Sequence, residues 1–154
     1  MADNRAFYNE ILIDHNMHPA HKHELPDADM EMRGYNPTCG DDITLRLKVS
    51  EGVVVDGAFT GSGCAISQAS ADMMLDLVIG KTTEEARKLD DIFMEMIRGE
   101  ASEENIEKLD EAAALQDISK MPARVKCAVL GWRTMREMFK TNEKCASCSN
   151  PNCH

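Results

Sequence analysis

A change of hydrophobic period near residue 61 restricts the fold more than any other feature of this sequence. From 43 to 49 apolar and polar residues alternate strictly, which is typical of a strand buried on one face. The polar segment 50–52 supplies a turn, and the β-branched run at 53–60 completes an antiparallel hairpin. After residue 61 the apolar residues recur every three or four positions, which indicates helices.

The helical patterns predict five helices. Cys64 stands at the start of one of them, and Thr82 with Glu85 forms a capping box that begins the next. Ser102 is the expected cap of a further helix, and Pro122 opens the last one, because proline is well tolerated in a first helical turn. The expected ranges are 7–15, 64–78, 82–97, 103–115 and 122–139.

Length and composition limit the classes of function. The 154 residues suit one domain, and a hydrophobic fraction of 43% is that of a globular protein. A net charge of −10 opposes binding to nucleic acid phosphates. The apolar runs are too short for a membrane-spanning helix, and no apolar signal core follows the N-terminus. We therefore expect a cytoplasmic protein without a nucleic acid or membrane partner.

Two groups of polar residues are interpreted as solvated surface. Eleven acidic and five basic residues lie between positions 81 and 111, which predicts an acidic outer face. Histidines stand at positions 15, 18, 21 and 23, and such a run can bind metal adventitiously. We interpret these four residues as solvated loop histidines.

The cysteines are the main candidates for chemistry, because six thiols in a chain without an export signal suggest a reducing compartment. Cys39 precedes Gly40, which can adopt the positive φ that directs neighbouring side chains to one point. Cys64 stands at a helix start, where the dipole favours thiolate, and Arg124 and Lys126 add positive charge beside Cys127.

Three thiolates and the carboxylate of Asp41 would form a tetrahedral ligand set suited to zinc. The carboxylate oxygen is a hard ligand among soft thiolates. It is therefore a candidate for the ligand that leaves the metal and frees a coordination position, as in a reactive site. Each cysteine taken alone is equally well read as a small buried hydrophobic residue. The spacing of Cys39, Cys64 and Cys127 forms no compact motif, so their convergence depends on the fold.

Four segments together resemble the successive motifs of the NifU N-terminal/IscU/SufU family, over a match from about Tyr8 to Phe139. The resemblance implies an α+β fold, a small antiparallel β-sheet with helices packed around it, in which Cys39, Asp41, Cys64 and Cys127 converge. The segments that carry it are Tyr8, His15 and Pro19, then Asn36-Pro37-Thr38-Cys39-Gly40-Asp41, Gly61-Ser62-Gly63-Cys64-Ala65-Ile66-Ser67, and Arg124-Val125-Lys126-Cys127.

Two features resemble the SufU branch more than the scaffold branch. Lys126 stands where IscU-type scaffolds carry a histidine, and the stretch between Cys64 and Cys127 is longer than in those scaffolds. The resemblance implies that Cys39, Asp41, Cys64 and Cys127 bind Zn²⁺. It further implies that Cys39 accepts sulfur from a SufS-type cysteine desulfurase for a downstream cluster assembly complex.

Two other functions stay open at this point. The same four side chains could hold a nascent [2Fe-2S] iron-sulfur cluster on a scaffold, or they could close a structural zinc site in an interaction module. We expect a domain at 1–140 and a Cys-rich tail at 141–154. The tail residues Cys145, Cys148, Cys153 and His154 are candidate ligands of a second metal or sulfur-handling site, or part of a redox-labile tail.

Overall fold

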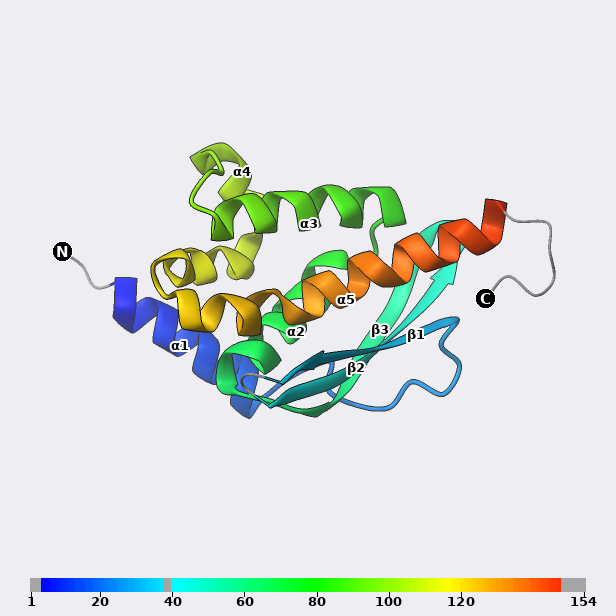
Figure 1. Cartoon of the computed structure of the whole chain (residues 1–154), viewed down its shortest axis with the longest axis horizontal. Helices are drawn as coiled ribbons and strands as arrows, with labels where there is room; N and C mark the ends of the chain where they lie inside the picture. The colour runs from blue at the N-terminus through cyan, green and yellow to red at the C-terminus, as the bar shows by residue number, and fades with distance from the viewer. Residues whose placement is uncertain (1–3, 38–39, 148–154) are drawn as a thin grey trace.

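The computed structural model describes residues 4–37 and 40–147 and has an α+β architecture in layers. A three-stranded antiparallel sheet forms one layer, and the helices α2 (Ala65–Val78) and α5 (Pro122–Ser147) pack on one of its faces. Helix α3 (Thr83–Ile97) lies on the other side of these two helices, away from the sheet (Figure 1). The fold class implied by the family resemblance is thus confirmed.

The predicted hairpin consists of β2 (Asp41–Ser50) and β3 (Val53–Ser62), which pair in an antiparallel register with Leu45 opposite Phe59. Of the alternating apolar residues of β2, Ile43, Leu45 and Leu47 are fully buried, as their period requires, and Val49 is half-buried.

A third strand, β1 (Met30–Asn36), pairs with β2 and was not anticipated. Its segment contains charged residues and a glycine, so its strand signal is weak. Gly34 lets this strand approach α5, because a Cβ there would overlap the hydroxyl of Thr134. The packing of β1 against α5, and not a local sequence signal, therefore explains why this segment forms a strand.

The core lies between the sheet and the outer helices. Trp132 of α5 is fully buried and stacks on Phe93 of α3, with 4.2 Å between the ring centroids. Its indole N–H donates to the Ser70 hydroxyl of α2 at 3.1 Å. The apolar residues of the last predicted helix are thus part of the core.

The acidic region is confirmed as mainly exposed, with one exception and one wrong boundary. Asp90 is buried, at 2% exposure, beside Arg136. The helix expected at 103–115 is instead two elements, α4 (Glu103–Glu107) and the 3₁₀ helix η1 (Asp110–Lys120). Asp110 has φ of +49°, a left-handed conformation that cannot continue a right-handed helix. The capping box of Thr82 and Glu85 is present as predicted.

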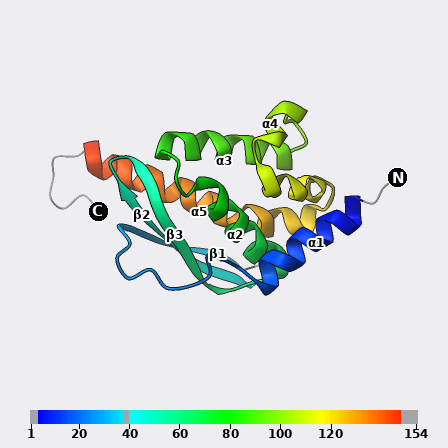
Figure 2. The same ribbon diagram turned by 180° about the vertical axis from the view of Figure 1, so that it is seen from behind.

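The interpretation of all four histidines as solvated is wrong for His15. Helix α1 (Asn4–Met17) carries it, and Figure 2 shows this helix beside α2. His15 is only 5% exposed and lies between the carboxylates of Asp72 and Glu111. Hydrogen bonding to Asp72 outweighs burial and raises the pKa of His15 to about 9. His18 and His23 are exposed, as expected.

None of the helices in the described ranges is both long and apolar enough to cross a membrane.

Candidate metal centre

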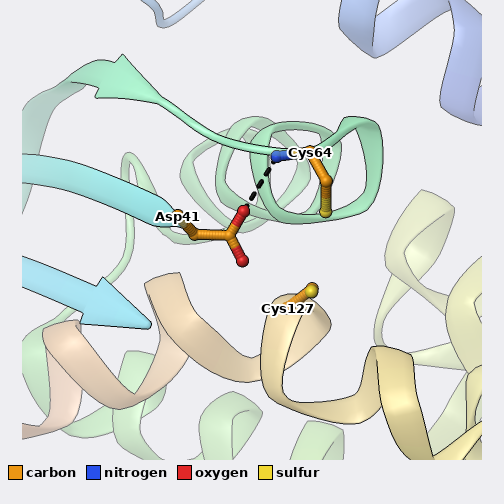
Figure 3. A group of neighbouring side chains, drawn as sticks. All are labelled: Asp41, Cys64 and Cys127. Carbon is orange, nitrogen blue, oxygen red and sulfur yellow. Dashed lines mark hydrogen bonds between the residues drawn. The ribbon is translucent and has the colours of Figure 1, made fainter. Parts of the chain in front are cut away.

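Three residues far apart in the sequence meet where three elements begin. Asp41 is the first residue of β2, Cys64 precedes α2, and Cys127 lies near the start of α5 (Figure 3). One ligand atom from each of these side chains lies within 4.8 Å of those from the other two. The structure thus brings together three of the four ligands expected from the sequence.

Cys64 is fixed by the first turn of α2. It is the N-cap residue, and its Sγ accepts a hydrogen bond from the Ser67 N–H at 3.4 Å. Its own N–H donates to Asp41 Oδ1 at 2.8 Å, the dashed line in Figure 3. The positive end of the α2 dipole faces this sulfur, which favours the thiolate form that binds metals.

Asp41 is fully buried, yet its surroundings stabilise the charged form. Burial alone would raise its pKa, but hydrogen bonds from the Cys64 N–H, the Cys127 thiol, Ser67 and Asn36 together lower it. The Ser67 hydroxyl donates to Oδ1 at 3.1 Å, and the Asn36 amide donates to Oδ2 at 3.3 Å. Gly63 makes room for this arrangement, because a Cβ there would overlap Ser67 Oγ and lie 2.9 Å from Asp41 Oδ1.

Cys127 is fully buried, like Asp41, whereas Cys64 is partly exposed. The Asn36 amide reaches the Cys127 Sγ at 3.9 Å and so bridges Cys127 and Asp41. Arg124 and Lys126, which were expected to add charge beside it, have exposed side chains. No ion pair links Arg124 to another residue in the described ranges.

Asn36 and Ser67 are supporting residues to which the sequence analysis assigned no role. Both stand within the motif segments that carry the family resemblance. Ser67 has a local signal, because it lies three residues after the N-cap Cys64. Asn36 has none, because its two partners come from β2 and α5.

The remaining predicted ligands lie outside the described part of the molecule. Cys39 falls in the gap at residues 38–39, although Gly40 beside it has the expected positive φ of +73°. Of the tail, Cys148, Cys153 and His154 lie outside the described residues, and Cys145 lies in α5 without a described side chain.

The donor set fits a metal cation on physical grounds. A buried carboxylate is costly unless a positive charge or hydrogen bonds compensate it. Among the described residues no lysine, arginine or histidine forms an ion pair with Asp41. Two sulfurs and one oxygen within ligand distance match zinc or iron-sulfur chemistry, with Cys39 available two residues before Asp41 as a fourth donor.

Comparison with known sequences gives a family match over nearly the whole chain. The family model of the NifU-like N-terminal domain matches residues 7–143. The chain is 43% identical over 136 residues to the iron-sulfur cluster assembly scaffold protein IscU of Thermotoga maritima, covering 88% of this chain and 94% of that one. It is 41% identical over 135 residues to the zinc-dependent sulfurtransferase SufU of Bacillus subtilis, covering 86% and 88%.

A solved structure agrees with this match. It is described as an iron-sulfur cluster assembly scaffold protein for the SUF system from Fervidobacterium islandicum AW-1. The two chains are 32% identical and superpose with a TM-score of 0.81, covering 89% of this chain and 99% of the other.

Proposed function

The chain belongs to the family of NifU-like N-terminal domains, and we propose that it is a zinc-bound sulfur acceptor in iron-sulfur cluster assembly. It takes persulfide sulfur from a SufS-type cysteine desulfurase and passes it to the downstream cluster assembly complex. The observation that carries the proposal is the convergence of Asp41, Cys64 and Cys127 within 4.8 Å. The similarity to a zinc-dependent sulfurtransferase supports the choice of zinc.

The proposed zinc ligands are Cys39, Asp41, Cys64 and Cys127. Asp41 and Cys64 are held in place by the start of α2, and Asn36 orients Asp41 against Cys127. A zinc ion in this set would supply positive charge that keeps the thiols deprotonated and balances the buried carboxylate.

Cys39 is the proposed sulfur acceptor. The acceptor must reach a sulfur carried by another protein. Cys127 is fully buried, and the Sγ of Cys64 accepts a hydrogen bond from the Ser67 N–H. In the transfer step the Cys39 thiolate attacks the outer sulfur of the desulfurase persulfide. A new S–S bond to Cys39 forms, the S–S bond of the desulfurase breaks, and the desulfurase cysteine leaves as a thiolate.

A scaffold for a [2Fe-2S] cluster is the second candidate. The names of the Thermotoga and Fervidobacterium relatives favour it, and thiolates with one oxygen are compatible with such a cluster. Against it, Lys126 stands where the scaffold branch carries a histidine, and no histidine contributes to the cluster of described ligands. In either role we place the protein in the reducing cytoplasm, where thiols are kept reduced.

One experiment separates the candidates. The anaerobically purified protein is incubated with a SufS-type desulfurase, cysteine and ferrous iron, and its mass is measured by native mass spectrometry. Zinc retained together with added sulfur that maps to Cys39 supports the sulfur acceptor. Replacement of zinc by iron and sulfide identifies a scaffold, and an unchanged zinc protein identifies a closed structural site.

The acceptor residue is tested by substitution. Cys39→Ala should abolish both the added sulfur and the stimulation of the desulfurase, because the attacking thiolate is gone. Thr38→Ala, at the neighbouring position, is the matched control and should keep both. Full sulfur loading of Cys39→Ala would remove Cys39 from the proposed step.

A further inference from the structure

A second cluster of metal-ligand side chains lies apart from the cysteines. His15 of α1, Asp76 of α2 and Glu111 of η1 each offer one ligand atom, and these atoms lie within 4.8 Å of one another. They come from three elements whose sequence positions span almost a hundred residues. Their meeting is therefore a product of the helix packing.

The imidazole of His15 is oriented as a metal-binding histidine usually is. Its Nδ1 faces Asp72 Oδ2 at 2.6 Å, and Asp72 is itself buried and accepts the His21 backbone N–H through Oδ1 at 2.9 Å. Ligating histidines commonly have one ring nitrogen bonded to a carboxylate in this way, which fixes the ring and points the other nitrogen at the metal. Here the other nitrogen, Nε2, faces Glu111 Oε1 at 2.7 Å.

The carboxylates near Nε2 favour a cation. Asp76 and Glu111 also line a neighbouring hollow of about 200 Å³, together with Asp110, Met73 and Leu77. A second imidazole is close, because His21 Nε2 lies 2.7 Å from Asp76 Oδ1. Asp76 and Glu111 are both about half exposed, so a hydrated ion can reach them from solvent.

We propose that this cluster binds a divalent transition-metal cation through His15 Nε2, Asp76 and Glu111. Asp72 is the positioning residue that orients His15, and His21, which lies within hydrogen-bond distance of Asp76, is a further candidate donor. On binding, the proton on His15 Nε2 is released to solvent and the nitrogen lone pair goes to the metal. Imidazole and carboxylate ligands without thiolate suit Mn²⁺, Fe²⁺ or Zn²⁺, so this site differs in chemistry from the cysteine centre.

The test uses Mn²⁺ as the probe and the full-length, zinc-loaded protein. Mn²⁺ is the weakest binder of the first-row series and prefers oxygen and nitrogen ligands, so it leaves the cysteine centre and the C-terminal cysteines alone. Binding removes the electron paramagnetic resonance signal of the free aquo ion, which gives the affinity directly. Zinc content is measured in parallel to confirm that the cysteine centre is unchanged.

The variants are Asp76→Asn and Glu111→Gln, with Glu104→Gln as the matched control. Glu104 is an exposed acid of the same region but outside the cluster. Loss of an outer partner of a ligand alone costs about 10–100-fold in metal affinity, so loss of a ligand should weaken Mn²⁺ binding at least about tenfold.

The expected result is one saturable Mn²⁺ site in the wild-type protein that is weakened in both cluster variants and retained in Glu104→Gln. The proposal is overturned if the wild-type protein binds no Mn²⁺. It is equally overturned if all three variants bind like wild type or weaken together, because binding would then reflect only the general acidity of the surface.

Discussion

Replacing Gly63 by alanine should disturb the cysteine centre without removing any ligand. The added Cβ would overlap Ser67 Oγ and lie 2.9 Å from Asp41 Oδ1. Asp41 is fully buried and held by several donors, so the Ser67 hydroxyl is the group that must move. Rotation of Ser67 breaks its 3.1 Å hydrogen bond to Asp41.

The magnitude follows from that bond. A hydrogen bond to a charged acceptor is worth about 1.5–3 kcal/mol. Alanine recovers about 0.4–1 kcal/mol by restricting the unfolded chain. The net effect of Gly63→Ala is therefore a loss of about 1–2 kcal/mol in the free energy of unfolding. A comparable loss in zinc binding would weaken the affinity on the order of tenfold, because Asp41 is then less well oriented.

Urea denaturation of the zinc-free protein and a zinc competition assay measure the two effects separately. Ser67→Ala supplies the control, since it removes the hydroxyl that the new Cβ would overlap. In the Ser67→Ala protein, Gly63→Ala should lower the free energy of unfolding by clearly less than it does in wild type. The difference between the two losses is the coupling energy of a double-mutant cycle. Strict additivity of the two substitutions, or a Gly63→Ala protein with wild-type stability and zinc affinity, would refute the reasoning.

Two further predictions concern the core. Burial raises the pKa of Asp90 to about 6, against the opposing effect of Arg136. The contribution of Asp90 to the free energy of unfolding is therefore complete below about pH 4. About 3 kcal/mol of this free energy is lost as the pH rises through 6. Urea denaturation at pH 4.5 and 7.5 should show that the free energy of unfolding falls less between these pH values in Asp90→Asn than in wild type. An equal fall in both proteins would contradict this prediction. Trp132→Phe should cost about 2 kcal/mol, because it opens a cavity and removes the bond to Ser70. Urea denaturation followed by far-UV circular dichroism measures this loss in the free energy of unfolding. A urea midpoint equal to that of wild type would contradict the described packing of Trp132.

Much of the local structure was predictable because its causes are local. The hairpin follows from alternation in β2 and the turn before β3, and the start of α3 follows from the capping box at Thr82. These signals lie within a few residues of the structure that they determine. Strand β1 and the break at Asp110 lack such signals, because packing against α5 and a left-handed backbone residue decide them.

The candidate ligands could be named from the sequence, because thiols and a carboxylate are recognisable as metal donors wherever they stand. Their distances could not, since Asp41, Cys64 and Cys127 meet only after β2, α2 and α5 are packed. Asn36 is a further case, because its amide has no role until β1 lies beside both Asp41 and Cys127.

His15 shows the same division most clearly. Its sequence neighbours are polar and other histidines follow it, so the local pattern indicates a solvated residue. Its partners Asp72 and Glu111 are 57 and 96 residues away. The sequence thus determined which side chains this protein has for binding metal and where its helices and hairpin form. Only the tertiary structure decided which of those side chains share a site, because long-range packing sets the distance between them.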